Sequence, residues 1–230
     1  MILNNFIVFE GIDGAGTTTQ IRMLMDKAEK EGLKERFFFT AEPTKASTGQ
    51  YLRKMLRGDF CVTNETAAYL FAADRNEHIN GTLCTEGNAL ITGIKEACRQ
   101  DRIVISDRYF FSSLAYQSIT CNPDVPRALN AFFPLPVLMF YFDIEPSVSI
   151  KRLGARDYRE IYEKEDFLNK AVNEYRKILK EYSLGEKNQG MKTVIIDATA
   201  NKEYINSLIW KELQSILSPT LKKDKKMPIL

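Results

Sequence analysis

The segment that most constrains this chain is a glycine-rich loop between an apolar run and a helical pattern, IVFEGIDGAGTTTQ at residues 7–20. Gly11 and Gly16 occupy the first and sixth positions of the pattern G-x-x-x-x-G-K-[ST], and Thr18 occupies its last position. Glycines let such a loop bend so that backbone N–H groups point at phosphate oxygens, and the following helix adds its positive end. The order of strand, loop and helix predicts a phosphate-binding loop. The alternative is a glycine-rich turn without a ligand.

Position 17 departs from this pattern, because Thr17 stands where such loops carry a lysine. A lysine there contacts the β- and γ-phosphates and neutralises charge that moves during phosphoryl transfer. Threonine offers a hydroxyl but no positive charge. The loss of one aimed donor in such a site costs on the order of 100-fold or more in rate. Either another cation takes the place of the lysine, or the activity is weak or absent.

Composition narrows the classes of protein that this chain can be. Its net charge of +2 is too small to imply a nucleic-acid or membrane partner. The cysteines at 61, 84, 98 and 121 form no CxxC pair, and His78 is the only histidine, so a zinc site is not expected. We expect free, buried thiols in a reducing compartment. We find neither a signal-peptide pattern nor a membrane-spanning run, and expect a cytoplasmic protein.

Apolar runs alternate with segments of helical periodicity along the chain. Five runs rich in β-branched and aromatic residues predict buried strands at 6–10, 36–41, 102–107, 137–144 and 193–198. Helical patterns lie between or after them, at 18–32, 63–80, 87–100, 157–183 and 203–217. The alternation predicts an α/β fold with a parallel sheet. No linker divides the chain, so we expect one domain over 1–230, with a flexible basic tail at about 219–230.

Charged residues follow the predicted strands at the end where open α/β sheets bind ligands. They are Glu10, Glu42, Asp107, Asp143 and Asp197. At any single strand, the better explanation is that polar residues end strands because the following loop is exposed to water. Several strands together favour a site at this edge of the sheet.

Four segments together resemble thymidylate kinases: FEGIDGAG at the loop, LFAADR (70–75), SDRYFFSSLAYQ (106–117) and FDIEP (142–146). The matching segments extend from residue 6 to about 200, and the DRY-x-x-SSLAYQ segment is the most specific of them. The resemblance implies a three-layer P-loop kinase fold around a five-stranded parallel sheet with a short lid. It also implies a homodimer that uses ATP and Mg²⁺ to convert dTMP to dTDP.

The resemblance assigns the donor nucleotide to the loop and one later arginine. The implied ATP-binding residues are Gly11, Asp13, Gly14, Ala15, Gly16, Thr17, Thr18, Thr19 and Arg152. Thr18 is expected to bind Mg²⁺, and Asp107 to position it through water. A simple surface ion pair between Asp107 and Arg108 is the alternative for these two residues.

The resemblance also implies the residues that bind dTMP. They are Glu42, Pro43, Arg53, Phe71, Arg75, Arg108, Ser113, Tyr116 and Gln117. Phe71 is expected to stack on thymine and Arg75 to donate to its O4, while Tyr116 crowds C2′ and rejects ribose. Arg108 is expected to bind the acceptor phosphate. Phe71 could equally be a core aromatic, and Arg53 a solvated helix residue.

The lid is expected at 151–166, where this chain also departs from the family. Ile161 stands where family members commonly have an arginine. We therefore predict that Arg156 and Arg159 supply the positive charge that Thr17 lacks, because guanidinium binds phosphate through two donors. The predicted catalytic residues are Asp13, Arg108, Arg156 and Arg159.

Two alternatives remain open at this point. One is a kinase for another nucleoside monophosphate or for a deoxynucleoside. The other is a nucleotide-binding paralogue with impaired catalysis, which Thr17 and Ile161 favour.

Overall fold

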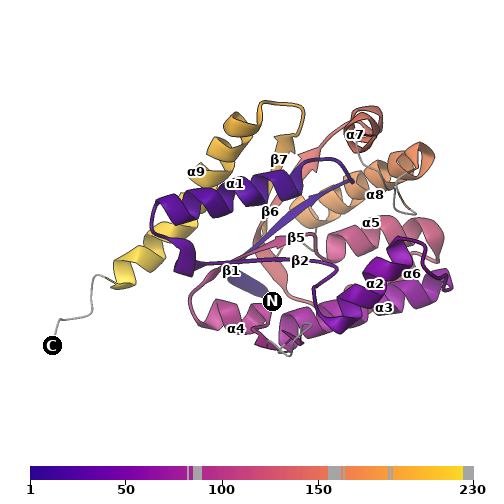
Figure 1. Cartoon of the computed structure of the whole chain (residues 1–230), viewed down its shortest axis with the longest axis horizontal. Helices are drawn as coiled ribbons and strands as arrows, with labels where there is room; N and C mark the ends of the chain where they lie inside the picture. Colours follow the sequence, from indigo (N-terminus) through magenta and orange to yellow (C-terminus); the bar gives the residue numbers. More distant parts are fainter. Residues whose placement is uncertain are drawn as a thin grey trace.

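The structure is a computed structural model that describes residues 1–81, 83–84, 90–154, 162, 164–185, 187 and 189–224. For residues 83–84, 90–91 and 218–224 it describes the backbone only. Within these residues the chain forms a parallel sheet between two layers of helices (Figure 1).

The five predicted strands are confirmed, and together they form one parallel sheet within the described residues. Its order is β2-β5-β1-β6-β7, so β1 lies at the centre. The strands are β1 (Ile2–Gly11), β2 (Phe37–Ala41), β5 (Ile103–Asp107), β6 (Leu135–Asp143) and β7 (Lys192–Asp197). The register pairs Phe9 with Asp107 on one side and with Phe140 on the other. The ends of β1, β5 and β6 therefore lie side by side.

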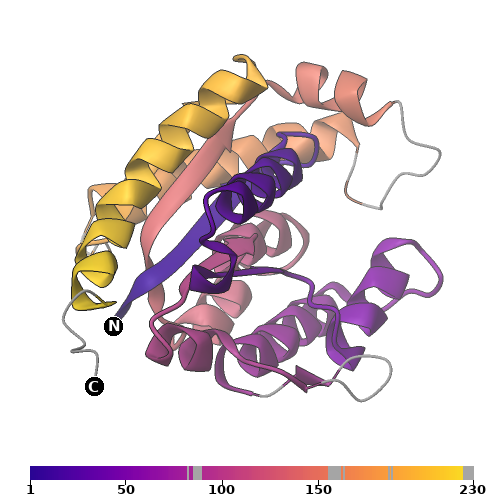
Figure 2. The same ribbon diagram turned by 60° about the vertical axis from the view of Figure 1, so that its left-hand side comes forward.

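Helices cover both faces of the sheet, as Figures 1 and 2 show. On one face α1 (Thr17–Lys30) packs against α9 (Lys202–Asp224), and on the other α5 (Phe110–Thr120) packs against α8 (Glu165–Ser183). A further pair, α2 (Ser47–Leu56) and α3 (Asn64–Asn80), lies beside the sheet near α5. The remaining elements are η1 (Lys34–Arg36), β3 (Leu83–Cys84), β4 (Leu90–Ile91), α4 (Ile94–Arg99), α6 (Asp124–Asn130) and α7 (Pro146–Leu153).

The core follows from the continuous apolar runs of the strands. Phe6, Ile7, Val8 and Phe9 are all fully buried, because side chains on both faces of β1 meet helices. On the edge strand β2, Phe37 stacks on Trp210 of α9 at a centroid distance of 6.0 Å. These contacts fix the strand ends that carry the site.

The helix predicted at 87–100 is wrong over its first part. Leu90–Ile91 form strand β4, which pairs antiparallel with β3, and the helix begins only at Ile94. A Cβ atom at Gly93 would collide with the carbonyl oxygen of Gly81, so the backbone there makes a close approach that needs glycine. β-Branched residues before this glycine favour the extended conformation.

Other expectations need smaller corrections. The helix predicted at 157–183 is described as α8 from Glu165, and residues 155–161 and 163 lie outside the described residues. Helix α9 continues to Asp224, so part of the expected flexible tail is helical. Cys61, Cys98 and Cys121 are free thiols as predicted, but none of these three is buried.

Candidate active site

The phosphate loop joins the end of β1 to the start of α1. Helix α1 has no side-chain cap at its N-terminus, so its first N–H groups remain available to an anion. Gly14 has a φ of +80°, and a Cβ atom there would lie 2.8 Å from the carbonyl oxygen of Ser149. Ser149, on α7, also donates a hydrogen bond to the carbonyl oxygen of Asp13. The loop is therefore held closely against α7 and has no room for a side chain at position 14.

The predicted site residues gather around one cavity of about 730 Å³ at the carboxyl ends of the strands. The predicted residues that line it are Asp13, Gly14, Ala15, Gly16, Thr17, Thr18, Thr19, Glu42, Pro43, Arg53, Phe71, Arg75, Asp107, Arg108, Ser113, Tyr116, Gln117 and Arg152. Gly11 lies behind the loop, where its carbonyl oxygen accepts a hydrogen bond from Arg108. Arg156 and Arg159 lie outside the described residues.

The two residues predicted to hold magnesium are in direct contact. Oγ1 of Thr18 donates a hydrogen bond of 2.6 Å to Oδ2 of Asp107. Hydroxyl and carboxylate oxygens are the hard ligands that Mg²⁺ accepts, usually together with several waters. The pair therefore fits the expected ion.

Arg108 follows Asp107 but does not pair with it. Its backbone has a φ of +72°, which carries the side chain away from that carboxylate and towards the phosphate loop. Nη2 of Arg108 donates to Oδ1 of Asp13 over 2.6 Å, and the guanidinium carbon lies 5.5 Å from the Tyr116 ring centroid. The hydroxyl of Tyr116 in turn donates to Oδ2 of Asp13 over 2.9 Å. Asp13 thus joins Arg108 to Tyr116, and the surface ion pair considered as an alternative is not formed.

Burial is the largest influence on the pKa of Tyr116. It raises the pKa of the Tyr116 phenol well above its ordinary value, and the nearby Asp13 carboxylate raises it further. Tyr116 is therefore neutral at physiological pH and acts as a hydrogen-bond donor.

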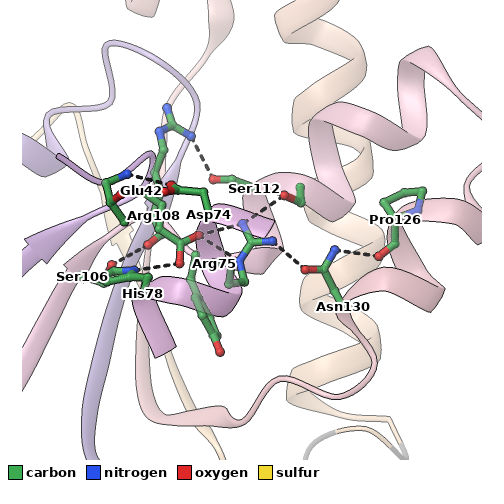
Figure 3. Close-up of polar contacts among 12 residues, drawn as sticks. Glu42, Asp74, Arg75, His78, Ser106, Arg108, Ser112, Pro126 and Asn130 are labelled. Atoms are coloured by element: carbon green, nitrogen blue, oxygen red, sulfur yellow. Dashed lines mark hydrogen bonds and ion pairs between the residues drawn. The ribbon is translucent and has the colours of Figure 1, made fainter. Parts of the chain in front are cut away.

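Arg75 lies at the centre of a buried polar network, shown in Figure 3. Its Nε donates to Oε2 of Glu42 over 2.9 Å and its Nη1 to Oδ1 of Asn130 over 2.6 Å. Its Nη2 donates to the hydroxyl of Ser113 over 3.0 Å. Oε1 of Glu42 lies 3.0 Å from Nδ1 of His78. These five residues, the Arg75 network, come from the loop after β2 and from α3, α5 and α6, and they fix the guanidinium at the cavity wall.

Gln117 has an unsatisfied acceptor near this network. The side chain is buried and lines the cavity, yet Oε1 has no hydrogen-bond partner among the residues that the structure describes. An orphaned buried oxygen beside a cavity calls for a donor from a ligand. Phe71, one turn before Arg75 on α3, is half-buried at the same cavity.

Arg53 is oriented by the loop after β2. It donates hydrogen bonds to the carbonyl oxygens of Pro43 and, over 3.4 Å, of Thr44. The Thr44 hydroxyl and N–H both donate to buried Asp74, at 2.5 and 2.8 Å. Arg53 is therefore part of the cavity wall, and Asp74 holds the loop that orients it.

Several residues of the site were missed by the motif comparison. Lys202, Tyr162 and Ser112 line the cavity, and Tyr175 and Asn130 hold residues that line it. Tyr162 stacks on Phe167 at 4.9 Å and meets the edge of Tyr116 at 5.9 Å. Glu10, which accepts a hydrogen bond from Tyr175, belongs with these residues, and it alone carried a signal in the sequence, as the charged end of an apolar strand.

No helix in the described part of the chain is long and apolar enough to cross a membrane. The described residues also contain no cluster of three or more histidine, cysteine or acidic side chains that could hold a metal ion. A metal at Thr18 and Asp107 therefore needs further ligands from water or substrate.

Comparisons with known proteins identify the family. Residues 9–209 match the family model described as thymidylate kinase. A relative from Treponema pallidum is 36% identical over 214 residues, covering 93% of this chain and 96% of the relative. One from Methanococcus aeolicus is 38% identical over 187 residues, covering 81% and 85%. A Leptospira interrogans protein named thymidylate kinase is 36% identical over 191 residues, covering 80% and 87%. With a matching model over most of its length, this chain belongs to the thymidylate kinase family.

Proposed function

We propose that this protein transfers the γ-phosphoryl group of ATP to dTMP, producing dTDP and ADP. The observation that carries this is the single cavity in which a phosphate loop, an acceptor-side arginine and a buried base-binding network meet. The family membership gives the reaction, and the described geometry supplies a place for both nucleotides.

The hydrogen-bonding groups of Arg75 and Gln117 are complementary to those at O4 and N3 of thymine. Thymine presents an acceptor at O4 and a donor at N3, and Arg75 donates while the free Oε1 of Gln117 accepts. Cytosine reverses both groups, with an amino group at C4 and an unprotonated N3, so it would leave buried polar groups unpaired. Such mismatches are strongly rejected. Phe71 would stack on the ring from α3.

The sugar and the acceptor phosphate would lie between this network and the phosphate loop. Tyr116, fixed by Asp13, would occupy the space that a ribose 2′-hydroxyl needs. Arg108 would bind the dTMP phosphate, with Arg53 on the side of the loop after β2. Glu42 would act by fixing Arg75, and Pro43 by forming the wall from which Arg53 is oriented.

The donor would lie along residues 11–19, with its phosphates against the start of α1. Thr18 and Asp107 would hold Mg²⁺, which would neutralise charge on the donor phosphates. Arg152 donates to the carbonyl oxygens of Ala198, over 2.9 Å, and of Gly14, over 3.5 Å, so it joins the phosphate loop to the loop after β7. Adenine would lie near these two loops.

Transfer between these sites needs no strong general base, because a phosphate monoester is already largely ionised near neutral pH. Catalysis would consist of alignment and charge stabilisation. Asp13 and Tyr116 would orient Arg108 on the acceptor side. On the donor side the missing lysine charge would come from Arg156 and Arg159 in the lid.

We also propose that the protein is a homodimer, as its family suggests. Tyr69 on α3 and Phe132 after α6 are 55% and 91% exposed, and both are large side chains that a partner surface could cover. Light scattering of the purified protein tests this, and a monomer at micromolar concentration would contradict it.

The reaction is tested by ADP release in a coupled assay with dTMP, dUMP, dGMP and dCMP. We expect turnover with dTMP and little with dCMP or dGMP. A protein that binds ATP yet releases no ADP with any acceptor would contradict the proposed function.

A further inference from the structure

Glu10 lies beneath the phosphate loop with no solvent exposure and four donors directed at its carboxylate. Oε1 accepts from the backbone N–H groups of Tyr109, at 2.8 Å, and Ser112, at 3.3 Å. Oε2 accepts from the hydroxyls of Ser112, at 2.6 Å, and Tyr175, at 2.8 Å. Glu10 therefore ties β1 to the first turn of α5 and to α8.

Ser112 carries this contact onward to Arg108. Nη1 of Arg108 donates to the Ser112 hydroxyl oxygen over 3.0 Å (Figure 3). An ionised carboxylate only accepts hydrogen bonds and a guanidinium only donates them. The Ser112 hydroxyl therefore accepts from Arg108, and it can donate to Glu10 or to the Tyr175 hydroxyl, which lies 2.9 Å away.

The other side-chain hydrogen bonds described for Arg108 lead to the phosphate loop, so Ser112 is its only described partner on α5. The same Nη1 also donates to the carbonyl oxygen of Gly11, and Nη2 donates to Asp13. The contacts to Gly11 and Asp13 draw the guanidinium towards the phosphate loop, whereas Ser112 holds it from the α5 side. Without Ser112 as an acceptor, the guanidinium has no described hydrogen-bond partner on α5.

We propose that Glu10 is a positioning residue, which acts through Ser112 to hold the Arg108 guanidinium in the orientation that receives the phosphate of the acceptor nucleotide. This rests on the proposed function, in which Arg108 binds that phosphate. Glu10 does not line the cavity, whereas Ser112 does, so Glu10 acts on the acceptor side only through its partners.

The variant Glu10→Gln tests this with almost no change in size. The two backbone N–H groups from α5 keep the amide oxygen on their side, so the amide NH₂ faces Ser112. Ser112 then accepts a hydrogen bond from position 10, and its own hydrogen turns towards other partners. Because Arg108 meets a reoriented hydroxyl, we expect KM for dTMP to rise on the order of tenfold. KM for ATP should change less than twofold.

Variants of Ser112 separate positioning from a general loss of structure. Ser112→Ala should raise KM for dTMP to a similar extent, and Ser112→Thr, which keeps a hydroxyl, should restore most of the affinity. In the Ser112→Ala background, adding Glu10→Gln should have little further effect on KM for dTMP, because the link is already broken. Additive effects of the two changes would overturn the inference.

A matched control removes another carboxylate far from the cavity. Glu212 on α9 pairs with Lys192 at 2.6 Å, so Glu212→Gln makes the same chemical change without touching the chain to Arg108. It should leave both KM values unchanged. If the unmodified protein phosphorylates dTMP but Glu10→Gln leaves its KM unchanged, the inference fails and the proposed function stands. If the unmodified protein is inert towards dTMP, the proposed function itself fails.

Discussion

Nη2 of Arg75 lies 2.7 Å from Oε2 of Glu42, and the two side chains are only 2% and 4% exposed. Arg99 and Glu96 on α4 stand at the same distance of 2.7 Å, but their side chains are 75% and 45% exposed. The two ion pairs are equal in length but differ in burial, and the exposed pair lies within one helix.

The first prediction uses this contrast. Glu42→Gln should lower the free energy of unfolding by about 3–5 kcal/mol, because it leaves the buried Arg75 charge without its counter-ion. Glu96→Gln should lower it by less than about 1 kcal/mol, because water already screens that pair. Urea denaturation followed by circular dichroism measures both. Equal losses in the two variants would contradict the argument.

The second prediction concerns Glu10 and pH. Burial raises the pKa of this carboxyl from 4.5 to about 7, although Ser112, Arg108, Tyr175 and the N–H of Tyr109 act to lower it. The folded protein therefore binds a proton that the unfolded chain has lost between these values. The contribution of Glu10 to the free energy of unfolding is fully present below about pH 4.5 and is lost as the pH rises through about 7. The loss is at most about 1.4 kcal/mol per pH unit.

The group facing Glu10 from β6 is Tyr141, whose own pKa is raised to a value too high to titrate in this range. Glu10→Gln should remove the pH dependence that the carboxyl contributes. The difference in unfolding free energy between the unmodified protein and this variant should therefore shrink as the pH rises. Denaturation series at several pH values between about 5 and 8 measure it. A difference that stays constant with pH would be evidence against a raised pKa.

The layout of the sheet could be predicted because each strand is buried on both faces and reads as a continuous apolar run. The rule that ligands bind at the carboxyl ends of parallel strands then placed Asp107 beside the phosphate loop, as the 2.6 Å contact with Thr18 confirms. Motif residues gathered there because they sit directly at strand ends or on the helices that begin there.

The partners that fix these residues could not be predicted in the same way. Arg75 is held by Glu42, Ser113 and Asn130, which come from three different elements distant in the sequence. Periodicity gives the face of a helix but not which distant side chain meets it. The positive φ of Arg108 likewise depends on the packing of β5 against β1, so its pairing with Asp13 instead of Asp107 left no signal in the sequence.

The third prediction concerns the metal pair. Asp107→Asn removes the negative charge that lies 2.6 Å from the Thr18 hydroxyl. We expect the Mg²⁺ concentration for half-maximal activity to rise by about tenfold or more, because a ligand-orienting carboxylate is lost. Initial rates with dTMP at fixed ATP and varied Mg²⁺ measure it. An unchanged Mg²⁺ dependence would show that this pair does not hold the ion.

The fourth prediction concerns the lid arginines. Arg156→Ala and Arg159→Ala should each lower kcat if these residues supply charge to the transferred phosphoryl group, and the larger effect should be on the order of 100-fold. KM for dTMP should change little, because the residues proposed to bind the base are Arg75 and Gln117 on the cavity wall. Steady-state rates at saturating ATP measure this. If neither variant lowers kcat, the charge comes from another residue, such as Lys202 at the cavity wall.

The last prediction returns to position 17. Thr17 is the first residue of α1 and lines the cavity, so a lysine introduced there starts from the same backbone position as the lysine of related loops. If the charge on the β- and γ-phosphates limits the rate, Thr17→Lys should raise kcat by about tenfold or more. The gain should be largest in the Arg156→Ala and Arg159→Ala backgrounds, where less positive charge remains. Combining Thr17→Lys with the two lid variants therefore tests whether a lysine at position 17 and the lid arginines supply the same positive charge. A gain that is equal in all backgrounds would mean that they act independently, and a loss of activity in each would mean that the loop has adapted to work without a lysine.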